Sequence, residues 1–182
     1  IYQNLHLIHG LDPEHVCVFG GDHIYKMDVR QMLDYHRQHN ARLTVAAIPV
    51  PVEQAHEFGV IEVDASGKMI GFEEKPKTNP KTIPGRPGFV LASMGNYIFE
   101  AKTLVSVLED DAKQADSKHD FGHNIIPVNA IYLDALWLRP RLTIFPKIGC
   151  HIRTIFQADA RGSPPVDGAS RRACRKFAAY TI

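Results

Sequence analysis

VCVFGGDHIYKMD, residues 16–28, is the stretch that decides the fold of this chain. Its four leading apolar residues predict a strand buried on both faces, as in a parallel sheet. Two glycines then permit a sharp turn, and Asp22 follows the carboxyl end of that strand, the edge where open α/β sheets bind ligands. A carboxylate there suits a Mg²⁺ that also holds phosphate groups. An ordinary turn aspartate is the alternative, and these residues alone leave both interpretations open.

A helix is predicted after the turn, because Asp28 is a typical N-cap and apolar residues recur at helical spacing to about Asn40. Residues 42–50 form a second apolar run, which predicts a buried strand ended by Pro49 and Pro51. A strand, a helix and a second strand in this order favour a parallel crossover. We therefore predict an α/β fold: a Rossmann-like domain with a mixed, mostly parallel sheet.

Residues 21–28, GDHIYKMD, resemble the signature of the glucose-1-phosphate adenylyltransferases, or ADP-glucose pyrophosphorylases. The resemblance implies that Asp22 is a catalytic residue that binds Mg²⁺ as the cofactor. It also implies nucleotidyl transfer from ATP to α-D-glucose 1-phosphate, giving ADP-glucose and pyrophosphate for glycogen or starch synthesis. Uridylyl or thymidylyl transfer to the same sugar phosphate is the alternative within enzymes.

A β-hairpin is predicted over residues 59–72, with a polar Asp-Ala-Ser-Gly turn between its arms. The charged run at 73–75 follows it directly, and such a run is ordinarily a solvated face. A functional interpretation exists as well. A lysine ammonium is a natural counter-ion for a sugar phosphate, and a carboxylate accepts hydrogen bonds from sugar hydroxyls.

The segments FGV at 58–60 and EKP at 74–76 resemble the same family at the same spacing. The resemblance implies that Gly59, Glu74 and Lys75 contact the sugar phosphate, with Lys75 as a catalytic residue beside Asp22.

A long buried strand is predicted over residues 89–99, where Gly95 indicates a bulge or a close backbone approach. Its segment SMGNY, 93–97, resembles the family's SMGxY, which implies that Ser93 binds the sugar nucleotide. Without the resemblance, Ser93 is simply a small residue in a crowded strand.

The segment HDFG at 119–122 resembles the family's HDFGxxxIP, which implies that Asp120 binds the glucose moiety. Asp120 is also a plausible helix cap, and the two roles can coexist. His119 and His123 have metal-ligand spacing, but the sequence offers no third ligand nearby, so we interpret them as surface histidines.

Composition is that of an ordinary globular protein: 182 residues, 45% hydrophobic and 23% charged, with a formal charge of +1. This balance argues against nucleic-acid and membrane partners, and no apolar run is long enough for a membrane span. The three cysteines are odd in number and far apart, which favours reduced thiols in a cytoplasmic or plastid-like compartment.

The resemblance also leads us to expect a motif that this sequence does not contain. The family's glycine-rich loop, GGxGxRLxPLT, is absent, so we expect the chain to be an internal fragment of a catalytic domain, truncated at its N-terminus and inactive by itself. In the family, the full-length protein is a homo-oligomer (tetramer).

Residues 129–182 differ from residues 1–128, which we assign to the nucleotidyltransferase domain. Here the family pattern stops, no acid stands where the second Mg²⁺ ligand is expected, and Arg139 onward holds nine Lys or Arg against two Asp or Glu. This divergent basic tail is a partner-binding extension, an unrelated segment, or translation in a displaced reading frame. We favour the displaced frame, because pattern and charge balance fail together.

Two hypotheses outside catalysis also remain. In the first, the chain is a non-catalytic subunit that binds sugar phosphate or product and serves regulation or assembly. In the second, it is an interaction fragment with a vestigial pocket. Binding of glucose 1-phosphate or ADP-glucose without turnover supports the former, and absence of binding supports the latter.

Overall fold

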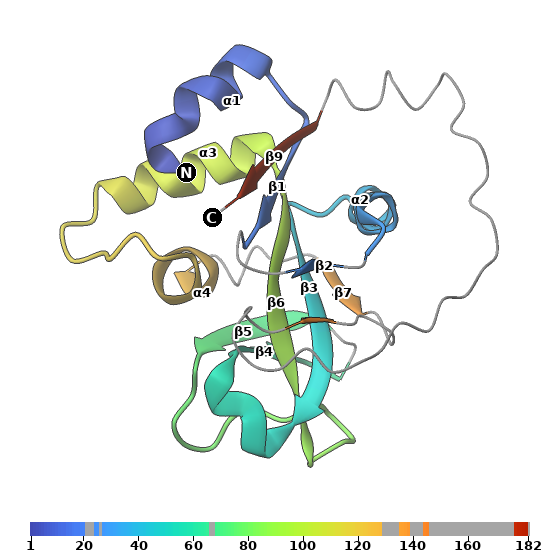
Figure 1. Ribbon diagram of the computed structural model, residues 1–182. Helices are drawn as coiled ribbons and strands as arrows, with labels where there is room; N and C mark the ends of the chain where they lie inside the picture. Colours follow the sequence, from blue (N-terminus) through green and yellow to red (C-terminus); the bar gives the residue numbers. More distant parts are fainter. Residues whose placement is uncertain are drawn as a thin grey trace.

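The computed structural model describes residues 1–20, 24–25, 27–65, 68–128, 135–138, 144–145 and 177–181 (Figure 1). Within these residues, a seven-stranded sheet forms the centre of the molecule. Its strands are β1 (His15–Phe19), β3 (Leu43–Pro51), β4 (Gly59–Val63), β5 (Met69–Glu74), β6 (Phe89–Glu100), β7 (Ala135–Leu138) and β9 (Phe177–Thr181). A separate short pair joins β2 (Ile24–Tyr25) to β8 (Ile144–Phe145).

The long strand β6 lies at the middle of the sheet and determines its topology. It pairs antiparallel with β3, with β1 and with β4. The predicted mixed α/β sheet is confirmed, but the prediction that it is mostly parallel was wrong for the described strands. The antiparallel pairs outnumber the parallel ones, β1–β9 and β3–β7. The reason is that β6 lies between β1 and β3 and runs opposite to both, so these two strands are not hydrogen-bonded neighbours.

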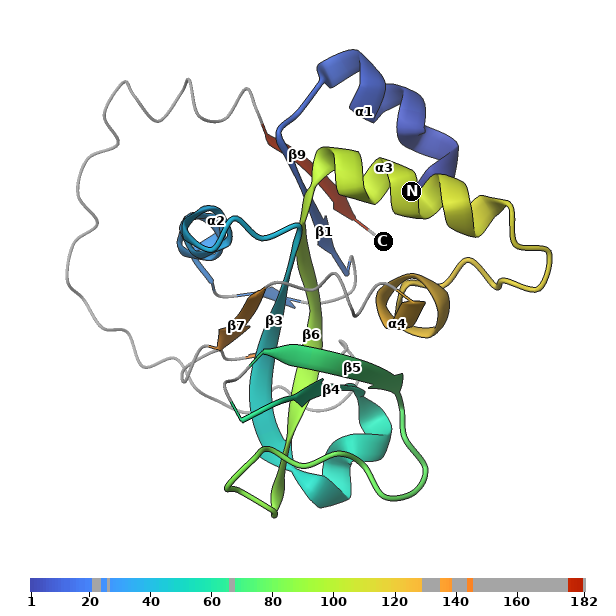
Figure 2. The same cartoon turned by 180° about the vertical axis from the view of Figure 1, so that it is seen from behind.

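Helices cover both faces of the sheet, as the alternation of apolar residues requires. On β1, Val16 and Val18 pack with α1 (Leu5–Leu11) and α3 (Ala101–Ala112) on one face. Cys17 packs on the other face with Met32 of α2 (Val29–Gln38). Figures 1 and 2 show α2 on one side of the central strands and α1 with α3 on the other. Burial raises the pKa of the Cys17 thiol to about 12, so it behaves as a core residue.

The local predictions for helices and turns are largely confirmed. Asp28 caps α2 by accepting the N–H of Arg30 at 3.0 Å, and the helix ends at Gln38, two residues before Asn40. Residues 52–57 form a 3₁₀ turn, η2 (Val52–Glu57). The remaining helical segments are η1 (Tyr2–Asn4), η3 (Phe121–Ile125) and α4 (Ile126–Val128).

One boundary was wrong, because β3 continues through Pro49 to Pro51. β7 pairs with residues 44–47 only, so beyond Ala47 one edge of β3 has no strand neighbour among the described residues. A proline, which has no N–H, is tolerated at such an edge.

Two segments of the divergent tail, β7 and β9, pair with β3 and β1 of the same sheet. The displaced reading frame proposed for residues 129–182 stays a prediction. Most of these residues lie outside the described part of the chain. In the part of the chain that the structure describes, every helix is too short or too polar to cross a membrane.

Candidate functional site

Five of the six residues predicted for the site lie in described segments, and Asp22 does not. Asp22 falls in the gap between residues 20 and 24, outside the described residues. Gly59, Glu74, Lys75, Ser93 and Asp120 come from β4, β5, the residue after β5, β6 and the residue before η3.

Three of these residues lie in a row across neighbouring strands. The ladder between β4 and β5 places Gly59 directly opposite Glu74. The ladder between β4 and β6 pairs Val60 with Ala92, so one further step brings Gly59 beside Ser93. Strand register therefore brings together residues that are 34 positions apart in the sequence.

The carboxylate of Glu74 is held between two glycines, and we name Gly59, Glu74 and Gly122 the glutamate clamp. A Cβ added to Gly59 would lie 2.7 Å from Glu74 Oε2, and one added to Gly122 would lie 2.6 Å from the same atom. Real Cβ atoms essentially never come so close, so only glycine lets both backbones reach the carboxylate. A Cβ on Gly59 would also collide with the Phe72 ring.

Lys75 lies beside the clamp with its ammonium group in solvent. Its backbone has the left-handed φ of +48°, which is uncommon outside glycine, and its N–H donates to the Phe58 carbonyl at 3.0 Å. The Lys75 Nζ is 3.7 Å from Glu74 Oε1, and the two side chains are 62% and 18% exposed. An exposed pair of this kind is weak, so the ammonium is available to a bound anion.

Asp120 caps η3, and this confirms the predicted role of Asp120 as a helix cap. Its Oδ1 accepts the backbone N–H of His123 at 2.8 Å and contacts His123 Nδ1 at 3.0 Å. Partial burial alone would raise the pKa of Asp120, but the hydrogen bonds and charge of His123 together lower it below its ordinary value. The Asp120 side chain is 53% exposed, so its carboxylate can still accept a hydrogen bond from a sugar hydroxyl.

Aromatic packing connects Ser93 to the segment that carries Asp120. The Ser93 hydroxyl lies 3.4 Å from the Tyr97 hydroxyl, and it accepts the N–H of Gly95 at 3.3 Å. The Tyr97 ring stacks on Phe121, with ring centroids 6.1 Å apart. The predicted bulge at Gly95 is confirmed by its φ of +66° and by the register shift in β3 opposite it.

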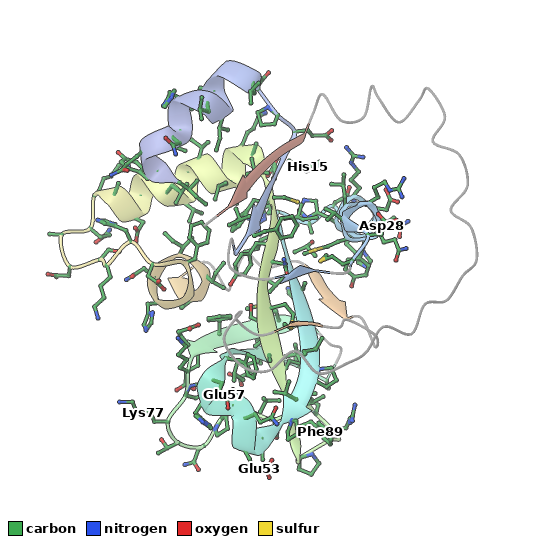
Figure 3. All side chains as sticks on the ribbon, in the orientation of Figure 1. His15, Asp28, Glu53, Glu57, Lys77 and Phe89 are labelled. Atoms are coloured by element: carbon green, nitrogen blue, oxygen red, sulfur yellow. The ribbon has the colours of Figure 1, made fainter. Side chains whose placement is uncertain are left out.

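A cavity of about 900 Å³ lies elsewhere, where β1 and β3 begin and β6 ends. Its lining includes Glu14, His15, Arg37 and Glu100, and as far as the described residues go it includes none of the predicted sugar-phosphate residues. Figure 3 labels His15 near this end of β6 and Phe89 at the other end. The cavity is therefore separate from the glutamate clamp.

The described residues do not form a metal site of their own. No group of three or more His, Cys, Asp or Glu side chains among them is arranged to hold a metal ion. His119 and His123 instead contact Asp111 and Asp120, and both rings are more than half exposed. The interpretation of the two histidines as surface residues agrees with this geometry within the described segments.

Sequence reasoning did not assign a role to Gly122, Tyr97 or Phe121. Gly122 meets Glu74, Tyr97 contacts Ser93, and Phe121 stacks on Tyr97. The signal for Gly122 was present, since it ends the HDFG segment two residues after Asp120. The neighbouring residues in the sequence do not show why the residue at this position must be a glycine. The need for it becomes visible only when Glu74 is placed against it.

Comparison with known proteins identifies the same family that the motifs suggest. The family model of the nucleotidyl transferases matches residues 1–133. Glucose-1-phosphate adenylyltransferase of Aliivibrio fischeri is 64% identical over 127 residues, which are 70% of this chain and 31% of the relative. Glucose-1-phosphate adenylyltransferase 1 of Vibrio cholerae is 61% identical with the same coverage. The chain thus spans about a third of the length of the curated relatives it matches.

Proposed function

Because this chain belongs to the nucleotidyl transferase family, we propose that it carries the sugar-phosphate half of an enzyme that makes ADP-glucose from ATP and glucose 1-phosphate. The glutamate clamp with Lys75 beside it is the observation that supports this proposal most directly. It presents a carboxylate for sugar hydroxyls and a cation for a phosphate within 3.7 Å of each other. Glucose 1-phosphate carries both kinds of group on one small molecule.

In the proposed reaction, a phosphate oxygen of glucose 1-phosphate attacks the α-phosphorus of ATP. The new O–P bond forms as the bond from the α-phosphorus to the bridging oxygen breaks, and pyrophosphate leaves in line. The attacking phosphate is already ionised, so positioning and charge neutralisation contribute more than a general base. Lys75 would hold the phosphate, Glu74 and Asp120 the glucose hydroxyls, and Gly59 and Ser93 would complete the pocket.

Asp22 is proposed to hold the Mg²⁺, which neutralises charge on the phosphates when bound. Asp22 lies outside the described residues. Adenylyl rather than uridylyl transfer is proposed on the names of the relatives. We also propose that the full-length protein assembles into a homo-oligomer. A displaced reading frame after residue 128 is a further proposal, and sequencing the coding DNA tests it.

The experiment is calorimetric titration of the chain with glucose 1-phosphate, with Lys81→Ala as the matched control for Lys75→Ala. Lys81 is 65% exposed and lies 3.8 Å from Glu62, almost the same setting as Lys75 beside Glu74. A charge-assisted hydrogen bond is worth roughly 1.5–3 kcal/mol, so Lys75→Ala should raise the Kd about tenfold or more. Lys81→Ala should leave the Kd within about twofold.

Absence of binding by the wild-type chain, or equal losses in both lysine variants, would contradict the proposal. In a form of the protein that catalyses the reaction, Lys75→Ala should raise the KM for glucose 1-phosphate far more than it lowers kcat. Equal losses of sugar-phosphate and ATP affinity would count against the role of Lys75.

A further inference from the structure

Three side chains that precede Asp120 bind one another, and sugar-phosphate binding does not explain them. Asp111 Oδ2 lies 2.7 Å from His119 Nδ1, and Asp111 Oδ1 accepts the Ser117 hydroxyl at 2.6 Å. The Ser117 oxygen in turn accepts the backbone N–H of His119 at 3.0 Å. We name Asp111, Ser117 and His119 the Asp111 bracket. Both carboxylate oxygens of Asp111 are therefore engaged within the protein.

Burial distinguishes Asp111 from the acid next to it. The Asp111 side chain is 13% exposed, whereas that of Asp110 is 68% exposed and contacts the exposed Lys113 at 2.9 Å. Both acids lie on α3, which Leu104 and Leu108 fix in the core. A nearly buried carboxylate is stable only where its hydrogen bonds are made, so the bracket ties the loop to a fixed helix.

The bracket acts on a residue with an uncommon backbone conformation. His119 has a φ of +56°, in the left-handed region that favours glycine. Such a conformation persists when the surroundings over-determine it. Here both the ring and the N–H of His119 are held. The next residue is Asp120, and two residues further Gly122 meets the Glu74 carboxylate.

We propose that Asp111, Ser117 and His119 are positioning residues that set the backbone of residues 119–122, so that Asp120 caps η3 and Gly122 reaches Glu74. They do not touch the substrate. Their importance for binding rests on the proposed function, because it requires that the glutamate clamp and Asp120 receive the sugar phosphate.

The test compares Asp111→Asn with Asp110→Asn. An asparagine in place of Asp111 would keep the shape of the side chain, but its NH₂ group cannot accept a hydrogen bond from Ser117 or His119. Two quantities are measured: the hydrogen exchange of the amides of His123 and Asn124, which donate to Asp120, and the Kd for glucose 1-phosphate. We expect Asp111→Asn to speed exchange at least about tenfold and to raise the Kd at least about fivefold. Asp110→Asn should change both by less than about twofold.

Each outcome decides a separate point. Unchanged exchange in Asp111→Asn would overturn the bracket, and faster exchange with an unchanged Kd would overturn its positioning role. If the wild-type chain does not bind glucose 1-phosphate, the proposed function fails, and the exchange data still decide whether the bracket holds the turn. If Asp111→Asn does not fold, Ser117→Ala, which removes one hydroxyl, carries the same test with smaller expected changes.

Discussion

Where β1 begins, charged side chains pair with one another around a cavity, whereas at the glutamate clamp one carboxylate lies between glycines with a solvent-exposed lysine beside it. At the first region, Glu14 contacts His15 at 3.3 Å and Arg37 at 3.4 Å. At the second, Glu74 lies 3.7 Å from Lys75, and its Oε2 is enclosed by Gly59 and Gly122.

The difference shows why cavity size alone is a poor guide in this protein. In the large cavity, Glu14 already contacts His15 and Arg37, so a ligand that binds to these groups would have to displace those contacts. At the clamp, close packing holds the Glu74 carboxylate in place, and the left-handed backbone of Lys75 sets the start of the exposed lysine side chain beside it. A preorganised polar group of this kind is what recognition of a small polar molecule requires.

The largest effect is expected from Gly122→Ala, with Gly88→Ala as its control. The new Cβ would lie 2.6 Å from Glu74 Oε2, and the carboxylate is the flexible end of a side chain, so it can move away. We expect unfolding free energy within about 1 kcal/mol of wild type, since alanine is favourable in a helical turn. The Kd for glucose 1-phosphate should rise at least about tenfold, because the carboxylate leaves its position.

Gly88 has no heavy atom within 4 Å of the corresponding Cβ position, so Gly88→Ala should leave the affinity unchanged. Calorimetry and denaturant unfolding measure the two quantities. Wild-type affinity in Gly122→Ala would show that the clamp is not where the sugar phosphate binds.

A second, smaller effect is expected at the cavity, in the pH dependence of stability. Burial lowers the pKa of His15 below its ordinary 6.5, despite the opposing charge of Glu14. The unfolded chain therefore takes up the proton at a higher pH than the folded chain, so the contribution of His15 is complete above 6.5 and is lost as the pH falls through the folded value.

The measurement is the unfolding free energy between pH 7.5 and pH 5 for the wild type and for His15→Gln. The glutamine variant should lose less stability on acidification than the wild type, and both should bind glucose 1-phosphate alike at neutral pH. An equal pH dependence in the two proteins would show that His15 does not change its protonation on unfolding.

The individual elements were predictable because their signals are local. The cap at Asp28, the hairpin around residues 59–72 and the bulge at Gly95 each follow from a few neighbouring residues. The order of strands was not predictable in the same way. Nothing local in β6 states that it inserts between β1 and β3, because that placement depends on packing between distant segments.

The residues of the candidate site also differ in whether local sequence could identify them. The residues Glu74, Lys75, Ser93 and Asp120 were selected from motifs, and strand register explains how Glu74 and Ser93 come near Gly59. Gly122 and the Asp111 bracket were missed, because their significance lies in contacts that the sequence does not spell out. Asp22 was selected with the same motifs, and it lies outside the described residues.

The smallest effect is expected from Arg37→Gln at the cavity. Arg37 Nη2 lies 3.4 Å from Glu14 Oε2, and the two side chains are 40% and 53% exposed. Exposed pairs of this geometry contribute about 0.5 kcal/mol, and salt screens them, so the loss of stability should shrink in about 1 M NaCl. The Kd for glucose 1-phosphate should stay within about twofold of wild type. If Arg37→Gln instead weakened binding as much as Gly122→Ala, the cavity would belong to the sugar-phosphate site. The ligand would then displace the contacts between the paired side chains around the cavity.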